Sequence, residues 1–318
     1  MTDLPVSFDD IRAAAGRIAP FVHRTPVLRS QRLNEILGGQ VFFKCENLQR
    51  IGAFKARGAH NAVFMLSDAE AARGVVTHSS GNHAAALALA ARNRGIAAHI
   101  VMPSNAPKAK VESVKRLGGL IVFCEPTVAA REAACRKIMD ETGAELVHPY
   151  DNSRVIAGQG TAAVELLEEH PELDAILAPV GGGGLMSGTS IAARAIKPSI
   201  RIVATEPAQA DDAWRSWTAK EWTAGDPANT IADGLRTTLG QRGFVILNAL
   251  LDDFVTVSED GIKDAMRLVW EVLKIVIEPS SAVPVAALLE RGLDLKGAAA
   301  GVILTGGNVD LDHLPWQA

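Results

Sequence analysis

The sequence predicts an α/β protein made of two domains, each built on a parallel β-sheet. Between about Val75 and Pro149, short β-branched runs alternate with Ala-rich stretches of helical spacing. The same alternation resumes at Leu173 and continues to the run AGVILTGGN near the end of the chain. Because alternating strand and helix patterns are typical of βαβ units, whose strands are parallel, the two blocks indicate two parallel sheets.

The first block predicts a small inserted domain over residues 75–149. Its expected strands are VVTHSS, AAHIVMP, LIVFCEP and ELVHP. Its expected helices run from Ala84 to Arg94, from about Lys108 to Leu117, and from about Ala129 to Thr142. This arrangement is a compact parallel βα unit.

Residues 1–74 and 150–318 are assigned to one large domain. Its expected strands include DAILAPV, RIVATEP, DFVTVSED and AGVILTGGN, with helices after Gly184 and from Gly261 to Ile275. The earlier segment VFFKCENLQRIGAFKARGAHNAV predicts a strand, a loop and a helix that opens near Phe54, and we assign it to the same sheet. Because no Pro- or Ser-rich linker separates the blocks, the two domains are expected to share an interface and a cleft.

The composition favours a globular protein without nucleic-acid or membrane partners. Of the 318 residues, 48% are hydrophobic and 21% are charged, and the formal net charge is -4. No basic run marks a surface for a phosphate backbone. The N-terminus lacks the basic and apolar regions of a signal peptide, and no apolar stretch reaches about 18 residues. We expect a soluble cytoplasmic protein.

Cys45, Cys124 and Cys135 have neither CxxC spacing nor paired Cys/His spacing. An odd number of cysteines without such spacing indicates neither a disulfide framework nor a zinc site. We interpret them as structural thiols.

The run Gly181-Gly182-Gly183-Gly184 is a strong signal for anion binding. It follows the strand pattern DAILAPV and precedes the helical stretch LMSGTSIAARAI. Four residues without Cβ let backbone amides approach a phosphate closely at a helix N-terminus. The spacing fits neither the GxxxxGK[ST] nucleotide loop nor a GxGxxG dinucleotide motif. Tight packing of the strand against the helix is the alternative explanation.

Two further turns carry polar side chains where expected strands end. The turn Ser79-Ser80-Gly81-Asn82-His83 precedes an Ala-rich helix and can hold a carboxylate, although N-capping by Ser or Asn explains it as well. The turn that begins at Thr305 contains two glycines, and a plain glycine-rich turn is its alternative explanation. Because ligands collect at the carboxyl ends of parallel strands, both turns are candidate binding sites.

Eight segments, taken in order along the chain, resemble one enzyme family. They are FFKCENLQRIGAFKARGA, VVTHSSGNHA, HPYDNSRVIAGQGT, PVGGGGLMSG, TEPAQADD, TIADGL, IEPSSA and LTGGNVD. They are similar to the serine racemase and serine/threonine dehydratase family, which includes 3-hydroxyaspartate dehydratases, and the match spans nearly the whole chain. Members are fold-type II pyridoxal phosphate (PLP) enzymes with a tryptophan-synthase-β-like fold. The resemblance therefore implies that the cofactor lies in the cleft between two parallel-sheet domains.

The resemblance also implies a role for each candidate residue. Lys55, which by spacing alone is an ordinary surface lysine, matches the residue that holds PLP as a Schiff base, and Phe54 matches a ring packed against the cofactor. Thr305 matches a hydroxyl beside the pyridine nitrogen. The remaining matches are the phosphate loop Gly181, Gly182, Gly183 and Gly184, the 3′-oxygen partner Asn82, and the substrate-carboxylate residues Ser79, Ser80 and His83.

A divalent-cation site is implied in the same way. Glu206, the carbonyl of Ala210, and Asp212 match a cation site found in many members of the family. Oxygen ligands of this kind suit Mg²⁺ or Ca²⁺, with Mn²⁺ as a further candidate, while a solvated acidic turn is the alternative. The family also implies a homodimer.

The implied reaction converts a β-hydroxy amino acid to a 2-oxo acid and ammonia. Lys55, freed by the incoming amino acid, acts as the base at Cα, and a neutral hydroxyl at Thr305 favours loss of the β-leaving group. Ser80 matches a second acid/base on the opposite face, so some racemisation is expected. Arg131 matches an arginine that reaches the distal carboxylate of dicarboxylate ligands. This match favours 3-hydroxyaspartate as the substrate and oxaloacetate as the product.

Several alternatives stay open at this point. Within the family they are an L-threonine or L-serine dehydratase, and a serine or aspartate racemase with side elimination. Outside it they are a β-replacement enzyme such as cysteine synthase and a catalytically inactive PLP-binding regulator. The segments SSGNHA and TEPAQADD argue against the β-replacement enzyme, and intact Lys55 and Ser80 argue against the regulator.

Overall fold

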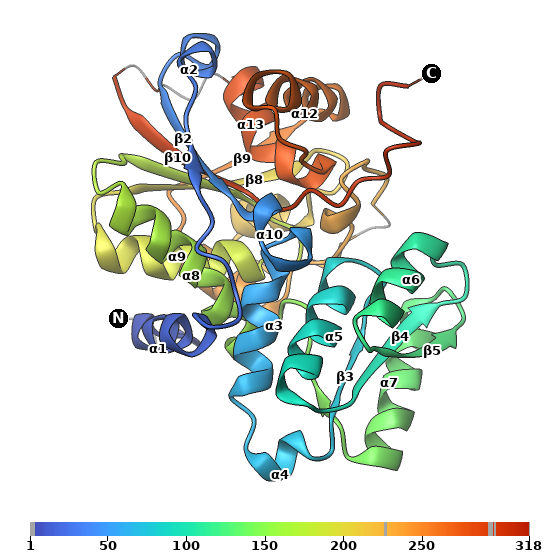
Figure 1. Cartoon of the computed structure of the whole chain (residues 1–318). Coiled ribbons are helices and arrows are strands. Elements are labelled where there is room, and N and C mark those ends of the chain that lie inside the picture. Colours follow the sequence, from blue (N-terminus) through green and yellow to red (C-terminus); the bar gives the residue numbers. More distant parts are fainter. Residues whose placement is uncertain (1–3, 226–227, 292–294, 296, 318) are drawn as a thin grey trace.

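The computed structural model describes residues 4–225, 228–291, 295 and 297–317, and it has the α/β class that the sequence predicts (Figure 1). Across these residues the strands form one six-stranded and one four-stranded sheet. We call them the large sheet and the small sheet. The predicted class, with two parallel-sheet units, is confirmed.

The large sheet combines strands from both ends of the chain. Its strands, in spatial order, are β1 (Val27–Leu28), β2 (Gln40–Cys45), β10 (Ala299–Leu304), β7 (Ala175–Pro179), β8 (Arg201–Pro207) and β9 (Asp253–Val257). β2 pairs in parallel with β10, as expected from its assignment to this sheet. The sequence did not predict β1, which pairs antiparallel with β2 at the edge.

The small sheet is wholly parallel over its described strands. Their spatial order is β5 (Leu120–Cys124), β4 (Ala98–Pro103), β3 (Val75–His78) and β6 (Glu145–Leu146). These strands match the four runs predicted between Val75 and Pro149. The domain boundaries at 74/75 and 149/150 bracket this sheet and stay a prediction.

Helices cover both faces of both sheets (Figure 1). The α-helices are α1 (Phe8–Ile18), α2 (Gln31–Leu37), α3 (Lys55–Phe64), α4 (Asp68–Ala71), α5 (Asn82–Arg94), α6 (Lys108–Arg116), α7 (Val128–Thr142), α8 (Ser153–Glu169), α9 (Gly184–Ile196), α10 (Asp212–Ala219), α11 (Gln241–Leu250), α12 (Glu259–Leu273) and α13 (Pro279–Arg291). Short 3₁₀ turns are η1 (Glu46–Leu48), η2 (Arg50–Gly52) and η3 (Asp233–Leu235). In the part of the chain described, no helix is both long and apolar enough to cross a bilayer.

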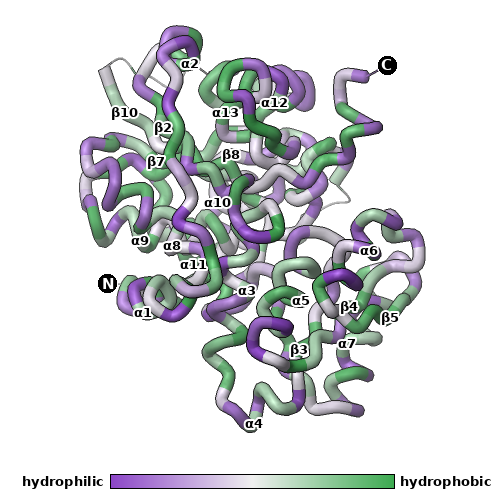
Figure 2. Tube along the Cα trace, in the orientation of Figure 1, coloured by the Kyte–Doolittle hydropathy of each residue, from purple (hydrophilic) through white to green (hydrophobic). Residues whose placement is uncertain are grey.

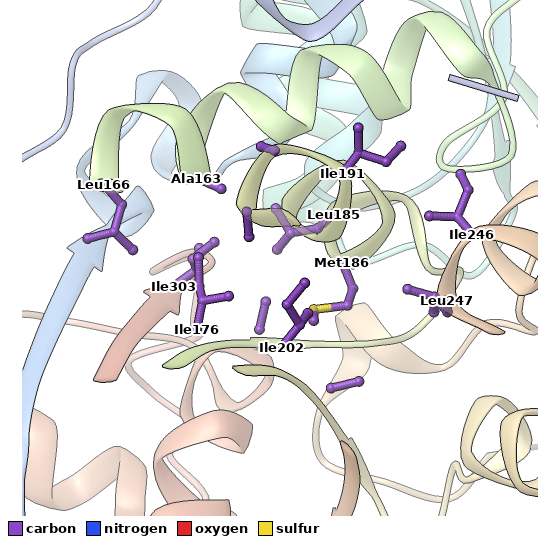
Figure 3. Packing of buried hydrophobic residues seen from close by; sticks show 14 of the residues in the cluster. Ala163, Leu166, Ile176, Leu185, Met186, Ile191, Ile202, Ile246, Leu247 and Ile303 are labelled. Carbon is purple, nitrogen blue, oxygen red and sulfur yellow. The ribbon is translucent and has the colours of Figure 1, made fainter. Parts of the chain in front are cut away.

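Both faces of the large sheet are buried, because successive strand residues point to opposite faces. In β7, Ile176 and Ala178 join one hydrophobic core, while Ala175 and Leu177 join the core on the other face. Figure 3 shows the first core, in which side chains of α8, α9 and α11 lie against strand residues. Figure 2 shows hydrophobic residues along the central strands and hydrophilic residues on outward-facing turns such as those of α12.

Helix α8 was not predicted, and the glycines in it explain why. Gly158 and Gly160 lower the intrinsic helix propensity of this segment. In the folded protein they allow close approach of other helices: a Cβ at Gly158 would lie 2.6 Å from the Cα of Gly58 on α3. A Cβ at Gly188 on α9 would lie 2.5 Å from the backbone nitrogen of Gly160. Tertiary packing therefore outweighs the weak local preference.

Replacing Gly188 by Ala should destabilise the protein by about 1–3 kcal/mol, because the new methyl group meets backbone atoms of α8 that cannot move aside. The matched control is Gly16→Ala on α1, where no atom lies within 4 Å of the added Cβ. Alanine at that exposed helical position should raise the free energy of unfolding by about 0.5–1 kcal/mol. Urea unfolding of the two variants measures both effects, and equal changes would contradict the close approach of α8 and α9.

Candidate active site

Lys55 is the first residue of α3 and lies where the two units meet. Its Nζ donates a hydrogen bond to the carbonyl oxygen of Pro149 at 2.8 Å and lies 5.1 Å from the centroid of the Phe54 ring. Burial lowers the pKa of Lys55 to about 8, although the negative charge of Glu278 acts in the opposite direction. At neutral pH, more of this amine is therefore unprotonated and nucleophilic than in an exposed lysine.

A buried ion-pair network fixes the start of α3. Arg57 is fully buried, and its guanidinium donates to Glu46 Oε2 on η1 and to Glu165 Oε1 on α8, each at 2.7 Å. Lys44 on β2 donates to the other oxygen of Glu165 at 2.6 Å. Arg57 has no role in the sequence-based predictions, because nothing local indicates partners 11 and 108 positions away.

Thr305 lies beside the segment that carries Lys55. Its carbonyl oxygen accepts a hydrogen bond from the backbone N–H of Phe54 at 3.0 Å, which brings the end of β10 next to the start of α3. Thr305 is buried, and among the described residues its Oγ1 has no hydrogen-bond partner. A buried hydroxyl without a partner is costly, so this atom fits a polar ligand atom such as a pyridine nitrogen.

Asn82 is the first residue of α5 and contacts Glu278 and Asn308, both from the C-terminal part of the chain. Its Nδ2 donates to the Glu278 carboxylate at 3.0 and 3.2 Å, and its Oδ1 accepts from Asn308 Nδ2 at 2.9 Å. Burial raises the pKa of Glu278 to about 7. The backbone N–H of Glu278 donates to Gly306, so Asn82 and Thr305 belong to one connected site. Sequence analysis quoted Glu278 and Asn308 within motifs but assigned them no role.

The serines before Asn82 do not cap α5. The N-cap residue is Gly81, and no side chain forms a capping hydrogen bond there. Ser79 Oγ instead accepts from the N–H of Gly81 at 3.3 Å, and both Ser79 and Ser80 are partly exposed. The N-capping explanation of this turn is therefore wrong. Because the first helical N–H groups have no partner within a helix, they can bind a carboxylate together with the serine hydroxyls.

Two histidines, His83 and His148, lie near Lys55, and a third, His78, packs against His148. Burial lowers the pKa of His83 to about 3 and that of His148 to about 4, and the charge of Lys55 contributes to both shifts. His83 Nε2 lies 3.1 Å from the carbonyl oxygen of Val147 and so carries the hydrogen, while its buried Nδ1 has no partner among the described residues. The rings of His148 and His78 pack edge to face with their centroids 5.7 Å apart. At neutral pH, His83 and His148 therefore contribute hydrogen bonds rather than charge.

The segment 147–151, which leads from the small sheet to α8, contacts several parts of the site. Besides the bonds to His83 and Lys55, it packs the ring of Tyr150 against Gly182 so closely that a Cβ at Gly182 would overlap the ring. The Asp151 carboxylate accepts from the N–H of Arg242 at 3.0 Å. The segment therefore connects the two units directly at the site.

The glycine run forms the predicted turn between β7 and α9. Residues 181–184 are buried, and Gly183 adopts the left-handed conformation with φ 85°, which favours glycine. A Cβ at Gly181 would lie 3.0 Å from Thr237 Oγ1, a buried hydroxyl without a partner among the described residues. Thr237 lies just beyond the motif TIADGL and was not identified from the sequence. The loop and this hydroxyl together suit an anionic ligand.

Arg131 stands apart from the residues above, on α7 beside the small sheet. It is partly buried, and its Nε is buried without a partner in the described part of the chain. Besides burial, which is the main cause, the charge of Arg131 contributes to the lowered pKa of His78. Arg131 is therefore close enough to His78 for its charge to act there, and its contact with a distal carboxylate stays a prediction.

The predicted cation ligands lie at the end of β8, which contains Glu206, and in the residues that follow, Ala210 and Asp212. Glu206 is fully buried; its Oε2 accepts from the N–H of Trp214 at 2.9 Å, and its Oε1 has no partner among the described residues. Burial and the nearby Asp212 raise the pKa of Glu206 well above its usual range. Within the described residues, no group of three or more His, Cys, Asp or Glu side chains is arranged as a metal site. The predicted site instead needs two carboxylates and the carbonyl of Ala210, and the unpaired Oε1 fits a cation ligand.

Protein stripped of cofactor should react with PLP at a rate that rises with pH through an apparent pKa of about 8, since only the neutral Lys55 amine attacks an aldehyde. Stopped-flow absorbance from about pH 6.5 to 10.5 measures this profile. Lys55→Arg, which keeps a charge but lacks a reactive amine, is the control and should show no such phase. A midpoint near the ordinary lysine value of 10.5 would contradict the effect of burial.

Comparisons with known proteins agree with this geometry. The model of the family described as "Pyridoxal-phosphate dependent enzyme" matches residues 18–306. The chain is 51% identical to the β-hydroxyaspartate dehydratase of Paracoccus denitrificans (98% of this chain, 99% of the relative). It is also 51% identical to the serine racemase of Oryza sativa subsp. indica (97% and 92%). The solved structure of maize serine racemase is similar with a TM-score of 0.95 and 48% identity, over 96% of this chain and 95% of that one. The chain therefore belongs to the pyridoxal-phosphate dependent enzyme family.

Proposed function

We propose that this protein is a PLP-dependent ammonia-lyase that dehydrates 3-hydroxyaspartate to oxaloacetate and ammonia. One observation carries the proposal: a single connected site contains both a Lys55 amine whose pKa is lowered to about 8 and a buried Thr305 hydroxyl without a partner among the described residues. The 51% identity to a β-hydroxyaspartate dehydratase supports the substrate. The proposal also includes a homodimer in the cytoplasm, as the family resemblance implies.

The residues present fit PLP. Residues 181–184 and the N-terminus of α9 would hold its phosphate, Phe54 would pack against its ring, and Asn82 would hold its 3′-oxygen. When bound, PLP supplies an electron sink for negative charge at the substrate Cα. A neutral hydroxyl at Thr305 cannot hold the pyridine nitrogen protonated as a carboxylate would, which favours departure of a β-hydroxyl.

Lys55 moves the first proton in this proposal. An amine with a pKa near 8 is an efficient base close to neutral pH, since it is partly deprotonated and still strongly basic. The substrate carboxylate would bind at the uncapped N-terminus of α5, against Ser79, Ser80 and His83. In that position Ser80 would face Lys55 across the substrate and exchange a proton on the opposite side. Racemisation would then accompany elimination.

One alternative has specific support, and the position of Arg131 argues against a second. The equal identity to a serine racemase supports a serine or aspartate racemase with side elimination, in which Ser80 has the larger role. An L-threonine or L-serine dehydratase needs no distal carboxylate partner and leaves Arg131 without a function. The buried, unpaired Nε of Arg131 favours the dicarboxylate substrate, because a guanidinium pairs well with a carboxylate.

A divalent cation at Glu206 and Asp212 completes the proposal. Asp212 Oδ2 accepts from the N–H of Leu239 at 2.8 Å, and the next residue, Gly240, donates its N–H to Gly182 at 3.2 Å. A cation here would neutralise two buried carboxylates and support the adjoining phosphate loop. Mg²⁺ and Ca²⁺ fit the oxygen ligands best, with Mn²⁺ as a further candidate.

Arg131→Ala should lower kcat/KM for 3-hydroxyaspartate by roughly thirty-fold or more, since truncating one partner of a partly buried charge pair costs about 2–5 kcal/mol. Dehydration of serine or threonine should change only a few-fold. Release of 2-oxo acid from each hydroxyaspartate isomer, threonine and serine measures this. Arg136→Ala on the same helix is the control, because Arg136 is exposed and pairs only loosely with Glu132 at 3.8 Å. Equal losses for both substrate types, or a wild-type preference for threonine, would favour the dehydratase alternative.

Added Mg²⁺ or Ca²⁺ should raise the Tm of chelator-treated protein by several degrees, because a ligand that binds only the folded state stabilises it. Glu206→Gln should abolish this shift, since it removes the charge while keeping the shape of the side chain. Asp211→Asn is the control: Asp211 pairs with Arg215 at 2.9 Å and should leave the shift intact. If the wild-type Tm responds to neither chelator nor cation, the cation site is absent.

A further inference from the structure

Asn308 connects three segments that are far apart in the sequence. The two hydrogens of its Nδ2 go to different acceptors, the carbonyl oxygen of Ile51 at 2.8 Å and Asn82 Oδ1 at 2.9 Å. Its backbone N–H donates to Glu278 Oε2 at 3.2 Å. Asn308 lies in the loop after β10, so one residue of the large-sheet unit holds the residue that opens α5 beside the small sheet.

These contacts set the orientation of the Asn82 carboxamide. The oxygen and the nitrogen of an amide differ little in shape, so the chemistry of their neighbours decides which way the group points. Asn82 Oδ1 faces a donor, Asn308 Nδ2, and Asn82 Nδ2 faces an acceptor, the Glu278 carboxylate. Turning the amide over would oppose oxygen to carboxylate and NH₂ to NH₂. Both neighbours therefore favour the same orientation.

We propose that Asn308 is a positioning residue that keeps the Nδ2 of Asn82 turned toward the cofactor's 3′-oxygen. The inference rests on the proposed function, because it takes PLP as the ligand of this site. Asn308 touches neither substrate nor cofactor in this role and acts only through Asn82. Sequence motifs do not identify it, since the two acceptors of its side chain are 257 and 226 positions away.

The Ile51 contact extends the role of Asn308 to the segment before Lys55. Ile51 has φ 58° and Gly52 has φ 71°, so two successive residues adopt the left-handed conformation, which is strained for a β-branched side chain. The bond from Asn308 Nδ2 to Ile51 and the bond from Gly307 N–H to Gly52 (2.9 Å) hold this turn. Asn308 therefore connects the segment before Lys55 with Asn82, the proposed partner of the cofactor's 3′-oxygen.

Asn308→Asp and Asn308→Ala distinguish orientation from packing. Asp has nearly the same shape as Asn but presents an oxygen to Asn82 Oδ1, which would turn the Asn82 amide over. Ala only removes the contact. If Asn308 orients Asn82, the Asp variant should be affected more than the Ala variant, whereas a packing role predicts the reverse order. Because Asn308 is exposed, Ala should weaken PLP binding only by roughly two- to ten-fold.

The readouts are the PLP dissociation constant and the absorption spectrum of the bound cofactor, which responds to hydrogen bonding at the 3′-oxygen. In an Asn82→Ala background, both Asn308 substitutions should lose most of their effect on the spectrum. Asn47→Ala and Asn47→Asp are the matched controls: Asn47 packs next to Gly307 and donates to Val276 at 3.0 Å, without contact to Asn82. Both should leave the spectrum unchanged.

An Asn308→Asp spectrum identical to wild type, or Asn308 effects that add fully to those of Asn82→Ala, would overturn the inference. If the Asp variant does not fold, the double variant with Asn308→Ala and Asn82→Ala still tests the inference. Its spectral change should be smaller than the sum of the changes in the two single variants. Failure of the proposed function gives a different result. In that case wild-type protein releases no oxaloacetate from 3-hydroxyaspartate although its complex with PLP forms, whereas failure of this inference alone leaves the wild-type activity, complex and spectrum intact.

Discussion

The buried ion-pair network around Arg57 is the interaction on which the geometry of the site depends. Arg57 lies two residues after Lys55, and its guanidinium holds Glu46 and Glu165, which reach it from η1 and α8. Burial alone would raise the pKa of Glu46, yet the charge and hydrogen bonds of Arg57 lower it. Removing one partner from such a group leaves a buried charge unpaired and costs about 3–5 kcal/mol. The network therefore ties the start of α3, and Lys55 with it, to the large sheet and α8.

Helix α3 packs against both units, which explains how one lysine can serve a site between them. Its residues Ala59, Ala62 and Val63 belong to the hydrophobic core under the small sheet. The neighbouring Gly58 meets α8, where the two backbones approach closely. A helix held by both units keeps the Lys55 amine in a partly desolvated position. That desolvation is the main cause of its lowered pKa.

Several polar side-chain atoms in or next to the candidate site are unsatisfied. Thr305 Oγ1, Thr237 Oγ1, His83 Nδ1 and Arg131 Nε are buried without partners among the described residues. Other such atoms, for example Gln159 Nε2, lie in helix interfaces away from the site, so an unpaired atom alone does not identify a binding site. The combination is more specific, because hydroxyl and imidazole groups lie with a glycine loop and the Lys55 amine, whose pKa is lowered by burial, at the carboxyl ends of parallel strands.

The sequence by itself determined the fold class, the positions of most strands along the chain, and the local segments that carry Lys55, residues 79–83, residues 181–184 and Thr305. These features are local, since hydrophobic period and glycine content act over a few residues. It did not predict helix α8, whose glycines weaken a local preference that packing restores. Nor did it predict Glu46 and Glu165 around Arg57, Thr237 beside the loop, or Asn308 above Asn82. Only the tertiary structure decided these contacts and the pKa of Lys55, because hydrogen bonding and desolvation depend on groups that folding brings together from distant parts of the chain.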